Sequence, residues 1–172
     1  MKPTVFLDRD GVINRRIVGD YVTCLSEFEI LEGVLEAIAE LNKAGYRTVV
    51  VTNQRGIAIG RMSRDDVDRV HQYLAARVSE MGGALNEFFI CPHDRDQGCP
   101  CRKPEAGLLD QADLAEPVDW QRSWLIGDSD SDIEAAHARN VRTIKVAGPS
   151  KASPHFLAEN LPLAVACILA QT

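Results

Sequence analysis

Two aspartates separated by one residue, Asp8 and Asp10, end an apolar run near the start of the chain. The run, Thr4–Leu7, is typical of a buried strand, and Gly11 lets the chain turn sharply away after the pair. Two carboxylates this close repel each other unless a divalent cation neutralises them, so the pair could support metal-assisted or acid–base chemistry. An Asp-x-Asp at a strand end is also common as a turn or a helix cap. The pair alone does not decide between these interpretations.

Three further polar sets follow three later apolar runs. They are Thr52 with Asn53, Arg102 with Lys103, and Gly127-Asp128 with Asp132. Taken alone, each set could be turn residues, a solvated lysine or a helix cap. In a parallel sheet, however, ligands bind outside the carboxyl ends of the strands. The placement of four polar sets at strand ends therefore favours one common site at this edge of the sheet.

A second group of chemically active residues lies in the segment "CPHDRDQGCPCRKP". Its three cysteines and one histidine, Cys91, His93, Cys99 and Cys101, offer ligands that suit a closed tetrahedral zinc site. The Cys-x-His and Cys-x-Cys spacings are tighter than the usual finger pattern, so spacing alone leaves free thiols as an alternative. Four protein ligands leave no open position, and such a metal would be structural.

The elements that would position these residues alternate between strands and helices. Apolar runs predict strands, and apolar residues at steps of three and four predict helices. Strands are expected over residues 4–8, 46–53, 87–91, 123–128 and 141–146. Helices are expected over residues 34–45, 63–81, from about 105, 130–138 and 161–170. This alternation predicts an α/β fold, a doubly wound parallel sheet with helices on both faces.

Composition favours one domain over residues 1–172 and excludes some partners. The net charge of -6 provides no basic stripe for nucleic acid. The longest apolar run, Leu161–Ala170, is too short to span a bilayer, and no leader is visible, so we expect a cytoplasmic protein without a membrane partner. There the five cysteines should stay reduced, with Cys24 and Cys167 packed or incidental. No exposed apolar heptad is visible, and a monomer is expected.

The four strand-end sets also resemble the motifs of a known superfamily. "FLDRDGVIN", "VVVTNQRG", "CRKP" and "IGDSDSD" are similar, in order and position, to those of the haloacid dehalogenase superfamily. The resemblance covers about residues 4–146. Longer matches, including "LNKAGY", "TNQRGIAIG" and "CPH" followed by "CPCRKP", resemble its sugar bisphosphate phosphatases, which are related to histidinol-phosphate phosphatases.

The resemblance implies a magnesium-dependent phosphatase that forms an aspartyl phosphate. Asp8 would be the nucleophile and Asp10 the acid and base. Mg²⁺ would be held by Asp8, the backbone carbonyl of Asp10 and Asp128, with Asp132 supporting these ligands. The transferring phosphoryl group would be contacted by Thr52, the amide of Asn53 and Lys103.

The sequence between the motifs leaves no room for a separate cap domain, so an open site is expected. Specificity would then come from three loops, which are Arg15–Tyr21, Asn53–Gly56 and the zinc loop at about 91–101. The residues expected to bind a phosphorylated sugar substrate are Asn53, Gln54, Arg55, Gly56, Arg102 and Lys103. Arg15, Arg16 and Arg55 are usually solvated surface cations but remain candidates. The resemblance also supports structural Zn²⁺ on the Cys-His set.

Three functions are compatible with these observations. The first is a sugar bisphosphate phosphatase. The second is a histidinol-phosphate phosphatase, whose short zinc loop matches the five residues between His93 and Cys99. The third is a phospho-accepting regulatory domain, which also uses an acidic cluster, a threonine and a lysine on a doubly wound sheet. Such a domain needs neither the acid–base function at Asp10 nor a zinc site.

Overall fold

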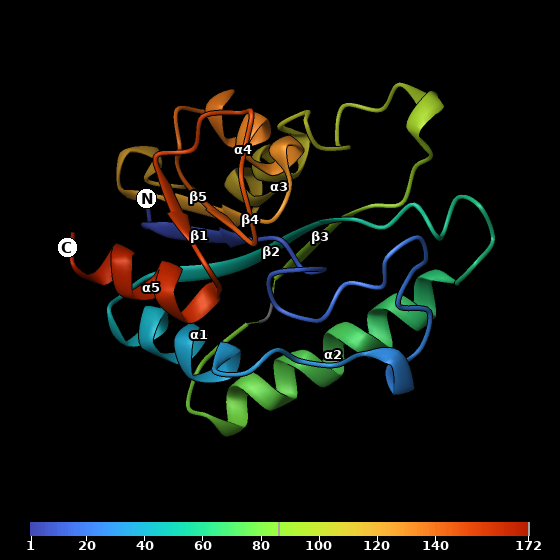
Figure 1. Ribbon diagram of the computed structural model, residues 1–172, viewed down its shortest axis with the longest axis horizontal. Coiled ribbons are helices and arrows are strands. Elements are labelled where there is room, and N and C mark those ends of the chain that lie inside the picture. Colours follow the sequence, from blue (N-terminus) through green and yellow to red (C-terminus); the bar gives the residue numbers. More distant parts are fainter. Residues whose placement is uncertain (86, 172) are drawn as a thin grey trace.

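One parallel sheet of six strands, in the order β3-β2-β1-β4-β5-β6, forms the centre of the molecule (Figure 1). The computed structural model describes residues 1–85 and 87–171. The strands are β1 Thr4–Leu7, β2 Arg47–Asn53, β3 Phe88–Cys91, β4 Trp124–Gly127, β5 Arg142–Val146 and β6 Phe156–Ala158. This order reverses direction between β1 and β4, which is the position where doubly wound sheets bind their ligands. The predicted doubly wound α/β fold is confirmed.

Helices cover both faces of the sheet (Figure 1). Figure 1 shows α1, α2 and α5 on one face, and α3 and α4 on the other. Their bounds are α1 Val34–Lys43, α2 Arg64–Glu80, α3 Gly107–Ala115, α4 Asp130–His137 and α5 Leu161–Leu169. Three short 3₁₀ helices lie in the connections, η1 Leu25–Glu27, η2 Arg95–Gln97 and η3 Trp120–Arg122.

Strand β1 is buried on both faces because it lies in the middle of the sheet. Val5 and Leu7 pack in the larger core, with residues of α1, α2 and α5. Phe6 points to the other face and packs with residues of α3 and α4. All three side chains are fully buried. The strand is thus held from both sides, and the residues that follow it start from a fixed position.

The long helix α2 begins where its sequence signal predicts. Ser63 Oγ accepts a hydrogen bond from the backbone N–H of Asp66, and Asp66 accepts one from the backbone N–H of Ser63. This reciprocal capping box satisfies two of the donors that a helix start leaves unpaired.

The main difference from the sequence prediction is the sixth strand, β6. Phe156 and Leu157 are 38% and 64% exposed, so the strand carries no buried apolar pattern that would reveal it. It forms by pairing with β5 at the edge of the sheet. The helix expected over residues 161–170 is present as α5, which buries Leu161, Val165 and Ile168 in the core.

The connections after β1 and β2 contain no separate cap domain within the part of the chain that the structure describes. Over that same part, no helix combines the length and the apolar character needed to cross a membrane.

Candidate active site

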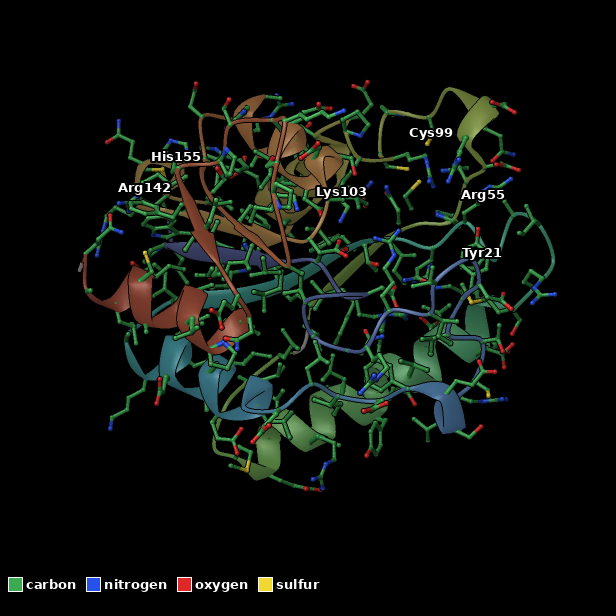
Figure 2. All side chains as sticks on the ribbon, viewed as in Figure 1. Tyr21, Arg55, Cys99, Lys103, Arg142 and His155 are labelled. Carbon is green, nitrogen blue, oxygen red and sulfur yellow. The ribbon has the colours of Figure 1, made fainter. Side chains whose placement is uncertain are left out.

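A cleft of about 410 Å³ opens at the carboxyl edge of the sheet. The residues predicted for metal and phosphoryl chemistry all line it, namely Asp8, Asp10, Thr52, Asn53, Lys103, Asp128 and Asp132. Figure 2 shows Lys103, Arg55 and Tyr21 on the side where the strands end, away from Arg142 and His155. The structure therefore brings the four polar sets together.

Lys103 lies at the centre of this cleft, almost fully buried. Its Nζ donates to Asp8 Oδ1 at 2.7 Å and to the carbonyl of Val51 at 2.8 Å, and it lies 2.5 Å from Asp132 Oδ1. The two neighbouring carboxylates raise the pKa of Lys103 despite its burial, so the ammonium form is favoured. A buried lysine charge thus holds the end of β1 next to the start of α4.

Three carboxylates, those of Asp8, Asp128 and Asp132, surround the single positive charge of Lys103. Burial raises the pKa of Asp8 to about 7, and the charges of Asp132 and Asp128 add to this, while Lys103 opposes it. Burial also raises the pKa of Asp128, to which Arg16 donates at 3.1 Å. Raised carboxylate pKa values mean that the negative charge here is only partly compensated by the protein. A bound cation would relieve this crowding.

Gly11 allows the first and fourth motifs to come together. Its φ of +92° lies in the left-handed region, and a Cβ at this position would lie only 2.2 Å from Asp128 Oδ2. Any side chain would therefore displace the carboxylate of Asp128. The sharp turn predicted from Gly11 is confirmed, and it also makes room for Asp128.

Asp132 contributes both to the start of α4 and to the cleft. Its Oδ2 accepts hydrogen bonds from the backbone N–H and the Oγ of Ser129, which forms the capping box of α4. Its Oδ1 faces Lys103. Oδ2 is therefore held by hydrogen bonds, whereas Oδ1 is in ion-pair contact with Lys103 but accepts no hydrogen bond from the residues that the structure describes. The helix start fixes the carboxylate in the cleft.

Asp10 lies beside Asp8 but has a different environment. Its Oδ1 accepts from Arg9 Nη2 and from Asn14 Nδ2, both at 3.0 Å, and its Oδ2 accepts from Gln54 Nε2 at 2.8 Å. Burial pushes the pKa of Asp10 upward, but the charge of Arg9 and these hydrogen bonds outweigh burial and lower the pKa. Asp10 is therefore a carboxylate at neutral pH. Asp8, with a pKa of about 7, is only partly ionised there.

The last two residues of β2, Thr52 and Asn53, and the loop that follows make contacts that the sequence did not reveal. Thr52 Oγ1 accepts from Gln54 Nε2 at 2.9 Å, which leaves its own O–H to donate. The side chain of Asn53 spans the backbone of Lys103, accepting from its N–H and donating to its carbonyl, both at 3.1 Å. Asn53 and Gln54 line the cleft, but these hydrogen bonds hold protein groups in place. Gly56 does not line the cleft, and a Cβ there would meet Met62 and Tyr21.

The arginines considered for substrate binding differ in their positions. Arg102 lines the cleft and donates to the carbonyl of His93 at 3.3 Å. Arg55 also lines it, but its guanidinium is paired with Asp94 at 2.5 Å. Arg16 reaches Asp128. Arg15 lies outside the cleft lining and pairs with Glu29 at the surface, at 2.8 Å.

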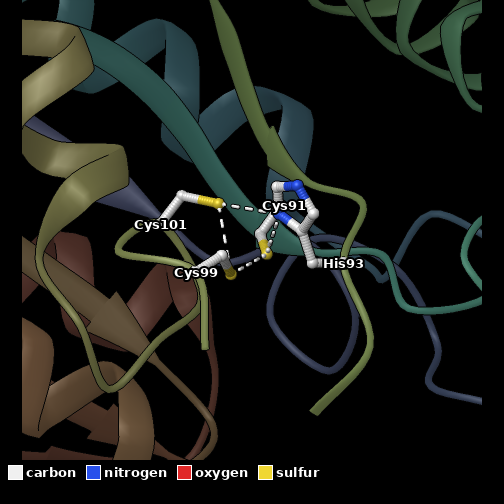
Figure 3. Close-up of side chains that lie close together, drawn as sticks. All are labelled: Cys91, His93, Cys99 and Cys101. Atoms are coloured by element: carbon white, nitrogen blue, oxygen red, sulfur yellow. Dashed lines mark hydrogen bonds between the residues drawn. The ribbon is translucent and has the colours of Figure 1, made fainter. Parts of the chain in front are cut away.

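The four residues predicted for zinc form one cluster (Figure 3). Cys91 Sγ and Cys101 Sγ each lie 3.6 Å from Cys99 Sγ, and His93 Nδ1 lies 3.6 Å from Cys91 Sγ and 3.2 Å from Cys101 Sγ. With Zn–S bonds of about 2.3 Å, tetrahedral ligand atoms are about 3.5 to 3.8 Å apart. The three separations of 3.6 Å lie in this range, and that between His93 and Cys101 is a few tenths of an ångström shorter. Burial raises the pKa of the Cys101 thiol to about 12, so this thiol would ionise only beside a cation.

Three residues near Asp10 were not predicted from the sequence as parts of the site. Arg9 and Asn14 donate to Asp10, and His71, from α2, lies 3.4 Å from Arg9. Arg9 and Asn14 belong to the first motif, but nothing in the sequence says which way their side chains point. His71 is a polar residue on the buried face of α2, and this departure from the apolar pattern is the one signal that could have revealed it.

Known proteins place the chain in a family. Residues 100–164 match the model of the HAD-hydrolase-like family. A D-glycero-alpha-D-manno-heptose-1,7-bisphosphate 7-phosphatase of Mycobacterium bovis is 43% identical over 142 residues, which cover 77% of this chain and 70% of that protein. A D-glycero-beta-D-manno-heptose-1,7-bisphosphate 7-phosphatase of Pseudomonas aeruginosa is 41% identical, with 83% and 79% covered.

A solved structure supports the same placement. The D,D-heptose 1,7-bisphosphate phosphatase of B. bronchiseptica, complexed with magnesium and phosphate, superimposes with a TM-score of 0.89 and 29% identity, with 99% of each chain covered. These relatives are hydrolases, which favours a phosphatase over a phospho-accepting regulatory domain. The chain therefore belongs to the haloacid dehalogenase-like hydrolases and, within them, to the family of the heptose-1,7-bisphosphate 7-phosphatases.

Proposed function

We propose that this protein hydrolyses D-glycero-D-manno-heptose 1,7-bisphosphate to heptose 1-phosphate, with Asp8 as the nucleophile. The contact of Asp8 and Asp132 with one buried lysine, Lys103, in a cleft that also contains Asp10, is the observation that carries the phosphatase mechanism. The names of the relatives at 43% and 41% identity support the choice of substrate.

The acidic cluster suits Mg²⁺, because this ion prefers oxygen ligands. Oxygens of Asp8, Asp128 and Asp132 lie within 4.8 Å of one another. We assign Asp8, Asp128 and the backbone carbonyl of Asp10 as ligands. Asp132 would support them, since Ser129 holds its Oδ2 and its Oδ1 faces the Lys103 ammonium. When bound, Mg²⁺ would supply positive charge that neutralises the carboxylates and the phosphoryl oxygens.

The chain's own residues then divide the reaction into two displacements. In the first, a carboxylate oxygen of Asp8 attacks phosphorus, the bond from phosphorus to the sugar oxygen breaks, and Asp10 gives a proton to that oxygen. In the second, water attacks the phosphorus of the aspartyl phosphate and gives a proton to Asp10, and the bond to Asp8 breaks. Lys103 and the Thr52 hydroxyl stabilise charge on the transferring group.

Asp10 must be protonated for the first step, although its partners favour the carboxylate. The arriving phosphate dianion places negative charge next to Asp10, which raises the pKa of the carboxyl and favours uptake of a proton. After the sugar leaves, Asp10 is again a carboxylate, which is the form that accepts the proton of the attacking water.

We also propose a structural zinc ion at Cys91, His93, Cys99 and Cys101. Cys101 directly precedes Arg102 and Lys103, and the carbonyl of His93 accepts from Arg102. The metal would therefore fix the loop that delivers both basic residues to the cleft. Because the ligands are spread over the loop, zinc binding would contribute directly to folding stability.

Zinc should co-purify at about one ion per chain, and Cys99→Ser should lose most of it. Without the metal we expect the melting temperature to fall by several degrees and kcat by at least about tenfold, because Arg102 and Lys103 are misplaced. Elemental analysis, calorimetry and phosphate release measure the three effects. Cys24→Ser is the matched control, since Cys24 is exposed and lies outside the cluster. Metal-free wild-type protein of full stability would contradict the zinc proposal.

The phosphate that is not hydrolysed needs positive charge away from the magnesium site. Arg102 and Arg95 line the cleft, and Arg102 can donate paired hydrogen bonds to a phosphate. Arg55 is less suited, because Asp94 already holds its guanidinium, and Arg15 lies outside the cleft lining. Histidinol phosphate carries a cationic amine instead, which these arginines would repel.

We therefore expect kcat/KM for D-glycero-D-manno-heptose 1,7-bisphosphate to exceed that for histidinol phosphate by at least about a hundredfold, or roughly 2.7 kcal/mol in transition-state binding. Arg102→Ala should reduce this ratio, because it should lower kcat/KM for the bisphosphate more than kcat/KM for simple monophosphates. Steady-state kinetics with both anomers of the sugar test this, and Arg15→Ala is the control with an arginine outside the cleft lining. A wild-type preference for histidinol phosphate would replace the substrate proposal with that alternative.

A further inference from the structure

Arg9 is a charged side chain in an unusual place. It lies between the two aspartates of the first motif, yet it is 0% exposed and is among the largest fully buried side chains. A buried charge is costly unless a partner compensates it. The carboxylate that pairs with Arg9 is Asp10, with Nη2 3.0 Å from Oδ1.

Arg9, Asp10 and Gln54 close a ring of hydrogen bonds. Arg9 Nη2 donates to Asp10 Oδ1 at 3.0 Å and to Gln54 Oε1 at 3.4 Å, and Gln54 Nε2 donates to Asp10 Oδ2 at 2.8 Å. Arg9 thereby also fixes the orientation of the Gln54 amide, with its nitrogen toward Asp10. The rotation of the Asp10 carboxylate is constrained from two directions.

A count of lone pairs identifies the oxygen that remains available. A carboxylate offers about four acceptor sites, two on each oxygen. On Asp10, Oδ1 accepts hydrogen bonds from Arg9 and Asn14, and Oδ2 accepts one from Gln54. The remaining site is on Oδ2, and Asp10 lines the cleft. Proton exchange with a bound phosphate ester would then take place at Oδ2.

His71 holds Arg9 from the opposite side. Its Nε2 lies 3.4 Å from Arg9 Nη1, and its ring stacks on Phe88 with centroids 4.4 Å apart. Since Arg9 can only donate, Nε2 must accept, which requires the neutral imidazole. Burial and the charge of Arg9 lower the pKa of His71 to about 3, in agreement with this. A helix of the outer layer therefore supports the acid–base residue through one arginine.

We propose that Arg9 is a positioning residue for Asp10, which holds Oδ2 toward the ester oxygen, and that His71 positions Arg9. This inference rests on the proposed phosphatase mechanism and adds two residues to it. Neither Arg9 nor His71 lines the cleft, so they act through Asp10. Their loss should slow the steps in which Asp10 moves a proton.

The choice of substrate separates this role from a merely structural one. A sugar phosphate needs a proton on its departing oxygen, whereas p-nitrophenyl phosphate has a leaving group that departs without one. With p-nitrophenyl phosphate, kcat/KM reports formation of the aspartyl phosphate, which does not depend on the acid. Its kcat still depends on the second displacement, in which Asp10 is the base.

For Arg9→Met we expect kcat/KM to fall about 30-fold with heptose bisphosphate and less than threefold with p-nitrophenyl phosphate, because general acid–base catalysis is only partly lost. With p-nitrophenyl phosphate, kcat and KM should fall together, and acid-quenched samples should contain more aspartyl phosphate than the wild type. Arg47→Met is the control. Arg47 is a second buried arginine, paired with Glu87 at the opposite end of β2 from the cleft.

A variant of His71 gives a second test in which the Arg9 charge is kept. His71→Leu removes the acceptor, and it should lower kcat/KM with heptose bisphosphate about five- to tenfold while kcat/KM with p-nitrophenyl phosphate changes little. His71→Gln retains an acceptor and should recover most of this activity. Equal falls in kcat for both substrates with unchanged KM, as expected for Arg47→Met if it loses folded protein, would overturn the positioning role. Unchanged kinetics in Arg9→Met would do the same.

Failure of the proposed substrate gives a different result. If wild-type protein does not hydrolyse heptose bisphosphate but hydrolyses p-nitrophenyl phosphate and glycerol phosphate, the substrate assignment is wrong. The Arg9 comparison is then made between glycerol phosphate and p-nitrophenyl phosphate, which differ in the same way in their leaving groups.

Discussion

Replacement of Asp8 by asparagine is expected to lower kcat by at least about a thousandfold, equivalent to about 4 kcal/mol or more of activation free energy. An amide is not a nucleophile toward phosphorus, so the first displacement has no attacking atom. The fold should persist, because the neutral amide relieves the crowding that raises the pKa of Asp8, and Asp132 still pairs with Lys103. Phosphate release and thermal unfolding measure the two effects.

The control for Asp8→Asn is Asp68→Asn, which changes a partly exposed carboxylate on α2 outside both the cleft lining and the acidic cluster. It should keep kcat within a few fold of the wild type. A kcat close to the wild-type value in Asp8→Asn would show that another group attacks the phosphorus.

Replacement of Asp10 by asparagine should also lower kcat by about a thousandfold, but at a different stage. Asp8 is intact, so p-nitrophenyl phosphate should still phosphorylate it, and the aspartyl phosphate should accumulate because no base activates water. Rapid acid quenching would measure this accumulation. Asparagine also leaves the buried Arg9 without a charged partner, and we expect a loss of stability.

Two outcomes would contradict the role of Asp10. One is normal turnover in Asp10→Asn. The other is low turnover without accumulation of aspartyl phosphate from p-nitrophenyl phosphate, since the variant would then fail before the step in which Asp10 acts as the base.

The strands of the fold were predictable where burial leaves a continuous apolar run. "YRTVVVTN" can only be a strand covered on both faces, and it became β2. Strand β6 was not predictable, because Phe156 and Leu157 are exposed and the strand exists through pairing with β5. The start of α3 was expected near Glu105 and lies at Gly107, since no capping side chain marks it.

The candidate site was predictable to the extent that its residues follow strand ends. The positions of Asp8, Lys103 and Asp128 in one cleft follow from parallel topology. Contacts between side chains were not predictable. Nothing in "TNQRG" indicates that Gln54 holds Asp10 or that Arg55 pairs with Asp94, because these contacts depend on loop geometry.

The central claim is that Asp8 becomes phosphorylated during turnover. Wild-type protein mixed with magnesium and heptose bisphosphate would be quenched in acid and reduced with borohydride, which converts an aspartyl phosphate to homoserine. Peptide mass spectrometry would then locate the modified residue. We predict homoserine at position 8, more of it in Asp10→Asn treated with p-nitrophenyl phosphate, and none in Asp8→Asn. Homoserine at another aspartate, or none in any sample while phosphate is released, would contradict the account.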